Sequence, residues 1–97
     1  MTDEFTKLFN TIESRKTSGI KKSYTKELLS KGSKKIAQKI GEESSELIID
    51  YLKGTKKRTT EEAVDLIYHL FVLLVSKKIN INDLKKEIKK RQVKNVR

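Results

Sequence analysis

Five acidic residues are spaced so that they could hold a divalent metal ion. Glu42, Glu43 and Glu46 form an E-E-x-x-E run, and Glu62 and Asp65 form an E-x-x-D pair further along the chain. All-oxygen clusters of this kind are the preferred ligands of hard cations such as Mg²⁺ or Mn²⁺. The whole chain carries a formal net charge of +10. Acids at a metal ion, with lysine and arginine around them, would suit metal-assisted attack on a polyphosphate.

Glu43 falls where a helix would be expected to be apolar. On a helical wheel of residues 33–52, Glu43 lies about 20° from Ile36, within an apolar face that also includes Ile40, Leu47 and Tyr51. Glu46 and Asp50 lie to the same side, and Glu42 lies farther round, at about 120°. A carboxylate inside an apolar face must find a cation or shift its pKa. We therefore expect a compensating partner for Glu43.

The second acidic pair could meet the first. Glu62 and Asp65 are three residues apart on the next expected helix and so share one face. If the two helices pack antiparallel, Glu43 and Glu46 would approach this pair, and four carboxylates would converge. The same pattern also has a simpler explanation that involves no metal ion. An E-E-x-x-E run is also typical of a solvated helix face, and Glu61 and Glu62 would favour a helix N-terminus.

Composition predicts an all-α protein. The chain has 97 residues, of which 35% are hydrophobic and 37% charged, with no proline and only four glycines. We expect one domain over residues 1–97, with a core from about 5 to 92 and a frayed tail from 93 to 97. So little apolar surface suggests that a partner chain completes the core.

The apolar periodicity predicts the helices that must position the acids. A first helix is expected from about residue 3, with its apolar residues within 3–12 and its end near residues 14–19. A polar loop is expected over 17–22, and a short helix or turn from Ser23 or Thr25 to Gly32. The long helix of residues 33–52 comes next. A helix capped by Thr59 or Thr60 would then run to about residue 76, with its apolar second half as the most buried element.

The last helix should begin near Asn82. Leu84 and Ile88 are expected to face the core, with four lysines facing solvent: Lys85, Lys86, Lys89 and Lys90.

The sequence favours a cytoplasmic location. Its longest apolar run, residues 66–75, is interrupted by His69 and is far shorter than the ~20 residues that a membrane span requires. The first residues combine acids with no uninterrupted apolar stretch, unlike a secretory signal. The absence of cysteine fits a reducing compartment.

Several stretches resemble one family. They are "ESRK" (residues 13–16), "SYT" (23–25), "KKIAQKIGEE" (34–43), "DLIYHLFVLL" (65–74) and "KKRQ" (89–92). Over about residues 8–92 the chain is similar to the phosphoribosyl-ATP pyrophosphatases, which belong to the MazG-like all-α nucleotide pyrophosphohydrolases. Their superfamily signature looks like the E-E-x-x-E and E-x-x-D spacing described above. Ser44 and Ser45 depart from the family pattern, because small apolar residues are more usual there.

The resemblance implies a fold, a reaction and a ligand set. The fold would be a MazG-like bundle of four to five helices completed by a homodimer. The reaction would be Mg²⁺-dependent hydrolysis of 1-(5-phospho-β-D-ribosyl)-ATP to the AMP compound and pyrophosphate, the second step of L-histidine biosynthesis. Glu43, Glu46, Glu62 and Asp65 would be the metal ligands, and Glu42 a further acid of the catalytic site.

Four basic residues are candidates for binding substrate phosphates: Arg15, Lys16, Lys35 and Lys39. The wheel favours Lys39, which lies about 60° from Ile36 on the acidic side of its helix. In a chain with 23 lysines and arginines, plain surface charge is the competing reading for each of them.

The apolar run of residues 66–75 includes three aromatic side chains, those of Tyr68, His69 and Phe71. A single histidine in an apolar run, such as His69, is typical of a hydrogen-bonded core residue, although its spacing from Asp65 also suits a supporting role beside a metal ligand. Tyr68 and Phe71 are expected in the core.

Two other functions compete with this reading. A house-cleaning nucleoside triphosphate pyrophosphatase of the same superfamily would share the metal site. A basic helical nucleic-acid-binding protein would explain the net charge and the lysine-rich last helix. It would leave the inward-facing acids unexplained, and the sequence shows no recognised nucleic-acid-binding signature, so we expect no nucleic-acid partner.

Overall fold

The computed structural model describes residues 3–17 and 23–93 and is all-α, as predicted. Its helices are α1 (Glu4–Arg15), α2 (Tyr24–Lys31), α3 (Ser33–Lys53), α4 (Lys56–Ser76) and α5 (Ile81–Val93). No helix in the described part of the chain is long and apolar enough to cross a membrane. Most of the predicted polar loop and the end of the predicted tail, residues 18–22 and 94–97, fall outside the described ranges.

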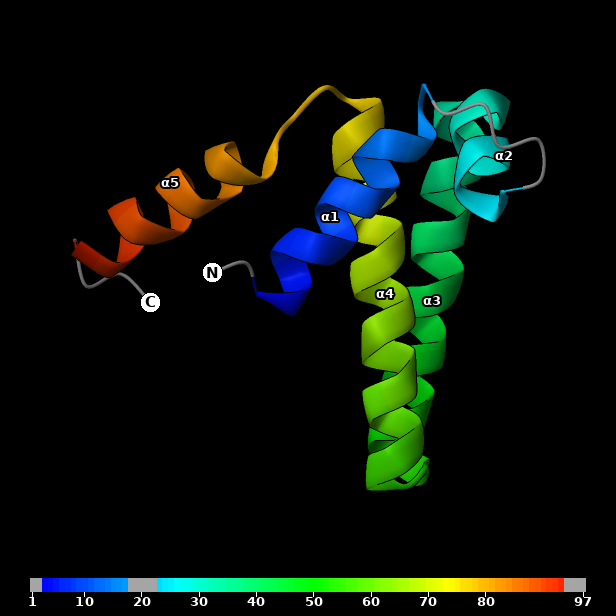
Figure 1. The fold of residues 1–97 in the computed structure, drawn as a ribbon. Helices are drawn as coiled ribbons and strands as arrows, with labels where there is room; N and C mark the ends of the chain where they lie inside the picture. The colour runs from blue at the N-terminus through cyan, green and yellow to red at the C-terminus, as the bar shows by residue number, and fades with distance from the viewer. Residues whose placement is uncertain (1–2, 18–22, 94–97) are drawn as a thin grey trace.

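An antiparallel pair of long helices organises the molecule. α3 and α4 run side by side, and α1 and α2 pack around the end where α3 begins and α4 ends (Figure 1). The core lies at this end and joins four helices through Phe9, Ile12, Leu28, Ile36, Phe71, Val72, Leu74 and Val75. Phe9 meets Phe71 edge to face, with ring centroids 5.3 Å apart. The second half of α4 is the most buried element, as its apolar run predicts.

The other end of the pair extends beyond the core as an arm. We call residues 44–61 the α3–α4 arm; none of them is buried. Tyr51, expected on the apolar face of α3, is 75% exposed in the single chain. The reason is that α1 and α2 do not reach this far along the pair, so the arm has nothing to pack against within the described chain.

The starts of α1, α2 and α3 agree with the sequence, and those of α4 and α5 do not. Asp3 and Ser23 cap α1 and α2. Thr55, rather than Thr59 or Thr60, caps α4 by accepting the Arg58 N–H at 3.1 Å. Thr59 lies one turn inside the helix, where its hydroxyl group lies 2.9 Å from the Thr55 carbonyl oxygen, so the predicted capping box is absent.

Gly54 explains why α4 starts early. A Cβ atom at Gly54 would lie 2.9 Å from the Asp50 carbonyl oxygen, so the tight turn that ends α3 needs glycine. Only Gly54 and Thr55 lie between the two helices, so Thr55 is the residue that caps α4.

α5 also departs from the prediction. Asn80, not Asn82, caps it: Asn80 and Asp83 each accept the other's backbone N–H, at 2.9 and 3.1 Å. Leu84 packs against the core as expected, but Ile88 is 50% exposed because the helix projects away from the body (Figure 1). The helix reaches Val93, so Val93 is not part of the predicted tail. The four lysines expected in solvent are exposed.

Candidate metal centre

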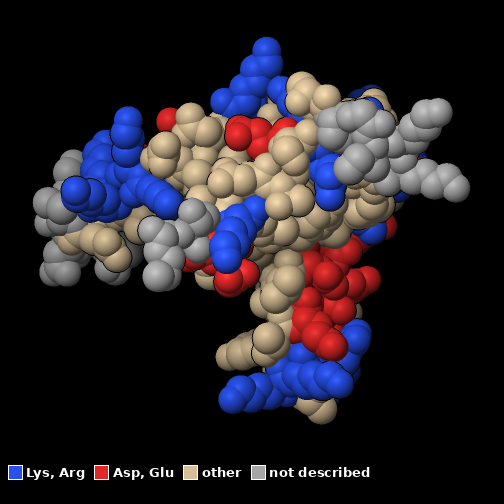
Figure 2. Space-filling model, in the orientation of Figure 1, with Lys and Arg blue, Asp and Glu red and all other residues tan. Residues whose placement is uncertain are grey.

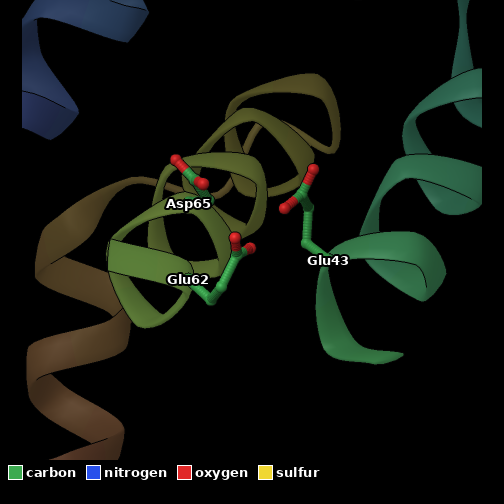
Figure 3. A group of neighbouring side chains, drawn as sticks. All are labelled: Glu43, Glu62 and Asp65. Carbon is green, nitrogen blue, oxygen red and sulfur yellow. The ribbon is translucent and has the colours of Figure 1, made fainter. Parts of the chain in front are cut away.

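Three of the five predicted acids meet where the core ends and the arm begins. Glu43 comes from α3, and Glu62 and Asp65 come from the facing α4 (Figure 3). Each offers a carboxylate oxygen that lies within 4.8 Å of the oxygens offered by the other two. Glu43 and Glu62 are only 8% and 6% exposed, whereas Asp65 is exposed to solvent. We call these three residues the carboxylate trio. Two of its side chains are buried in the protein, and the third is open to solvent.

Helix periodicity places the trio. Glu43 follows the buried Ile36 by seven residues, or two turns, so it continues the core face of α3. On α4, Glu62 precedes the buried His69, and Asp65 precedes the buried Val72, by the same interval. In the space-filling view, acids gather along the arm just beyond the apolar body (Figure 2).

Glu62 is electrostatically strained without a cation. Its Oε1 atom lies 3.1 Å from Arg58 Nη2, but its Oε2 atom is buried and has no hydrogen-bond partner in the described part of the protein. Burial raises the pKa of Glu62 above its ordinary value of 4.5, as do the nearby Glu46 and Asp65 carboxyl groups, and Arg58 only partly opposes them. An unpartnered buried oxygen among other carboxylates suits a bound divalent cation.

The remaining two acids of the motif are exposed and are not members of the trio. Glu46 is exposed, yet it is near enough to Glu62 to raise the pKa of that group. Glu42 is exposed and turned toward its own helix, with Oε2 3.6 Å from Lys39 Nζ and Oε1 accepting from Gln38 at 3.4 Å. The expected meeting of four carboxylates therefore has three close members, with Glu46 at its margin.

The candidate phosphate-binding residues are placed differently from one another. Lys39 Nζ lies 3.7 Å from Glu43 Oε1, beside the trio. Lys35 is one turn earlier on the same helix, and Arg15 ends α1. Lys16 lines a separate cavity of about 260 Å³ together with Ser76. That cavity is at the opposite end of α4 from the trio.

Sequence reasoning missed Arg58 as a site residue. Its guanidinium group reaches Glu62 and Glu61 on α4 and lies 3.8 Å from Asp50 on α3. It also lines an open cavity of about 490 Å³ with Glu62 and Asp65. The sequence does indicate this contact, because Arg58 lies four residues before Glu62, which is the spacing of an ion pair within a helix.

His69 is a hydrogen-bonded core residue, as the pattern predicts. Its ring contacts the Asp65 backbone oxygen and the Tyr24 hydroxyl group. Tyr68 is partly buried against the core and hydrogen-bonds to Thr25, while Phe71 is buried. This polar cluster adjoins the trio at Asp65.

Known proteins have sequences similar to this chain. The sequence profile described as phosphoribosyl-ATP pyrophosphohydrolase matches residues 5–92. A relative named phosphoribosyl-ATP pyrophosphatase from Bacillus cytotoxicus is 48% identical over 84 residues, which is 87% of this chain and 78% of the relative. Relatives of the same name from Bacillus cereus and Bacillus mycoides are each 46% identical over 94 residues, covering 97% of this chain and 88% of theirs. The chain therefore belongs to the phosphoribosyl-ATP pyrophosphohydrolase family of hydrolases.

Proposed function

We propose that the protein hydrolyses 1-(5-phospho-β-D-ribosyl)-ATP to the corresponding AMP compound and pyrophosphate, in the second step of histidine biosynthesis, with Mg²⁺ as cofactor. The relatives that match nearly the whole chain carry the name of this activity. The observation that carries the proposal is the carboxylate trio of Glu43, Glu62 and Asp65, of which Glu62 and Asp65 line an open cavity. Such an acidic site in a protein of net charge +10 suits a metal-bound polyphosphate.

The trio fits Mg²⁺ by its donor chemistry. All its donors are carboxylate oxygens, and Glu62 Oε2 lacks a partner in the described residues. Glu46 would complete the ligand set from the margin of the site, and Mn²⁺ would suit the same oxygens. Bound Mg²⁺ supplies positive charge that neutralises the triphosphate oxygens.

The protein's own groups orient the reaction. Lys39 is placed to bind phosphate oxygens beside Glu43. A carboxylate of the site orients a water molecule, which attacks a phosphorus atom; the P–O bond to the departing pyrophosphate breaks, and the water proton passes to the surrounding acids. Arg58 contacts Oε1 of Glu62 and leaves Oε2 available to a cation.

A pyrophosphate-release assay with phosphoribosyl-ATP, with and without Mg²⁺, tests the proposal. We expect turnover only with the metal, and loss of activity in Glu43→Ala and Asp65→Ala with helical content retained by circular dichroism. Undiminished activity in both variants would show that Glu43 and Asp65 do not form the metal site. Preferential turnover of ordinary nucleoside triphosphates would instead favour a house-cleaning pyrophosphatase.

We also propose that the protein works as a homodimer whose second copy covers the α3–α4 arm. Four large apolar side chains on the arm are more than half exposed: Ile48, Ile49, Tyr51 and Leu52. Because the arm is a two-helix hairpin with no buried residue, a second hairpin would complete a four-helix bundle and supply its missing core. Because the carboxylate trio lies where the arm begins, it would lie near this interface. A cytoplasmic location accords with a chain that lacks cysteine.

A further inference from the structure

Three lysines surround the turn at the end of the α3–α4 arm. Lys53 ends α3, and Lys56 and Lys57 begin α4. All three are exposed, and their ammonium groups form no ion pair or hydrogen bond within the described residues. Basic side chains accordingly cover this end of the arm (Figure 2). We call these three residues the tip lysines.

The tip lysines do not serve the carboxylate trio of their own chain. Lys53 lies ten residues after Glu43, which is ~15 Å along the helix. Lys56 and Lys57 precede Glu62 by six and five residues, which turns them ~120–140° away from its side of α4. They also lie in the first turn of α4, where positive charge opposes the helix dipole and so costs stability. Their charge is therefore available to another molecule.

One face of α3 on the arm is complementary to itself when a second copy of the chain runs antiparallel. Glu46, Ile49 and Lys53 are all exposed and share this face, since they are three and four residues apart. A twofold axis near Asp50 would bring Lys53 of each copy opposite Glu46 of the other, in two equivalent contacts. The two Ile49 side chains would then meet beside the axis.

The exposed apolar side chains favour the same arrangement. Those of α3 on the arm are more than half exposed and are centred on position 50: Ile48, Ile49, Tyr51 and Leu52. The axis that brings Lys53 to Glu46 therefore also covers this apolar patch with its own copy. A parallel arrangement would instead bring the tip lysines of both copies together, where like charges repel. Charge and apolar surface thus agree on one antiparallel register.

We propose that the tip lysines of one copy, Lys53 above all, complete the phosphate-binding site of the other copy in a dimer of antiparallel arms. Glu46 follows Glu43 by three residues, so a lysine opposite Glu46 stands beside the carboxylate trio. Phosphoribosyl-ATP brings a triphosphate and a further phosphate group to this site, which is already rich in carboxylates. Lysines from the second copy offset the resulting repulsion. This inference rests on the proposed pyrophosphatase function and dimer, and it deepens them by naming residues that act across the interface.

The first test removes the charge of the tip. The tip variant combines three substitutions: Lys53→Gln, Lys56→Gln and Lys57→Gln. We expect it to remain a dimer and to raise the KM for phosphoribosyl-ATP roughly tenfold or more, with kcat changed by less than about threefold, because contacts to the substrate's charge are lost. Calorimetric titration with inorganic pyrophosphate and Mg²⁺ should show weaker binding without requiring turnover.

A matched variant removes the same charge from α5. Its substitutions fall on exposed lysines outside the arm: Lys86→Gln, Lys89→Gln and Lys90→Gln. Both KM and pyrophosphate affinity should stay within about twofold of the unchanged protein, because charges beyond a Debye length are screened at physiological salt. An equal loss of affinity in both variants would overturn the inference, since general charge attraction would then explain it.

The second test uses mixed dimers, isolated through a different affinity tag on each chain. One chain carries Glu43→Gln with intact tip lysines, and the other is the tip variant with an intact trio. If the lysines act across the interface, the intact trio faces intact lysines, and we expect about half the kcat/KM of the unchanged dimer, because one of two sites is complete. If the lysines act within their own chain, neither site is complete. Activity no higher than that of the tip variant would overturn the inference.

The outcomes separate this inference from the function on which it rests. Normal turnover by the unchanged protein, with an unchanged KM in the tip variant, would overturn the inference alone. If the unchanged protein does not hydrolyse phosphoribosyl-ATP, the proposed function fails, and pyrophosphate binding then decides the role of the tip separately. Weaker binding in the tip variant alone would support that role, and equal binding in both lysine variants would overturn it.

Discussion

Arg58 Nη2 lies 3.1 Å from Glu62 Oε1 across one turn of α4, while Glu62 Oε2 is buried without a hydrogen-bond partner in the described chain. One oxygen of the carboxylate is thus neutralised and the other is not. Leaving a buried charge half satisfied costs stability, which a bound cation would recover. The same side chain is therefore expected to oppose folding in the metal-free protein and to favour metal binding.

Glu62→Gln should stabilise the metal-free protein at neutral pH. Because the pKa of Glu62 is raised in the folded state, the folded protein binds more protons than the unfolded chain between pH 4.5 and that raised pKa. The contribution of Glu62 to stability therefore falls as pH rises through this window, and stays low above it. The glutamine variant should lose this dependence, as measured by urea unfolding with a chelator at pH 4.5, 6 and 7.5.

Glu61→Gln is the matched control for this prediction. Glu61 is the exposed neighbour of Glu62 and also pairs with Arg58, at 3.5 Å, so the substitution removes the same charge without relieving burial. Its stability should follow that of the unchanged protein. Equal stabilisation by both substitutions would mean that net charge, and not burial of Glu62, is responsible.

Glu42 and Glu43 should differ sharply in activity although they are adjacent. Glu43 is 8% exposed and belongs to the trio, whereas Glu42 is exposed and pairs with Lys39. We expect Glu43→Gln to lower kcat/KM by more than about 100-fold and Glu42→Gln by about tenfold or less, since the latter loses only a supporting contact. Calorimetric titration with Mg²⁺ should show weakened binding in the first variant only. Comparable losses in both would place Glu42 among the metal ligands.

Periodicity predicted the inward position of Glu43, whereas the antiparallel packing of α3 and α4 entered the prediction only as a condition. It succeeded because two turns of a regular helix separate Glu43 from the buried Ile36, so local geometry decides the outcome. The exposure of Tyr51 and Ile88 could not be predicted in the same way. A wheel shows which face is apolar, but only the extent of the neighbouring helices decides whether anything covers that face.

The start of α4 was missed for a different reason. Three threonines, Thr55, Thr59 and Thr60, could each have capped the helix, and the capping-box spacing to Glu62 favoured the wrong one. The tight turn at Gly54 decides among them, because only Gly54 and Thr55 separate α3 from α4.

Thr55→Ala should destabilise the protein by about 1 kcal/mol, the usual cost of losing a helix cap. The Thr55 hydroxyl oxygen accepts the Arg58 N–H, and no side-chain oxygen remains at that position in the variant. Thr60→Ala serves as the control, because the Thr60 hydroxyl group only donates to the Lys56 carbonyl oxygen at an exposed site inside the helix. Denaturant unfolding should show a lower free energy of unfolding for Thr55→Ala alone. A loss in Thr60→Ala but not in Thr55→Ala would mean that the helix starts later, as the sequence predicted.

Ile48→Glu should convert the protein to a monomer. Ile48 is 58% exposed on the arm, and a carboxylate there would be buried without a partner if a second copy covers it. Light scattering after size exclusion should give a dimer mass for the unchanged protein, with a melting temperature that rises with concentration, and a monomer mass for the variant. Ile88→Glu is the matched control, since Ile88 has similar exposure but lies on α5, outside the arm, and its dimer should persist. If the unchanged protein is monomeric and still hydrolyses phosphoribosyl-ATP, the arm is not a site of self-association and its apolar side chains need another explanation.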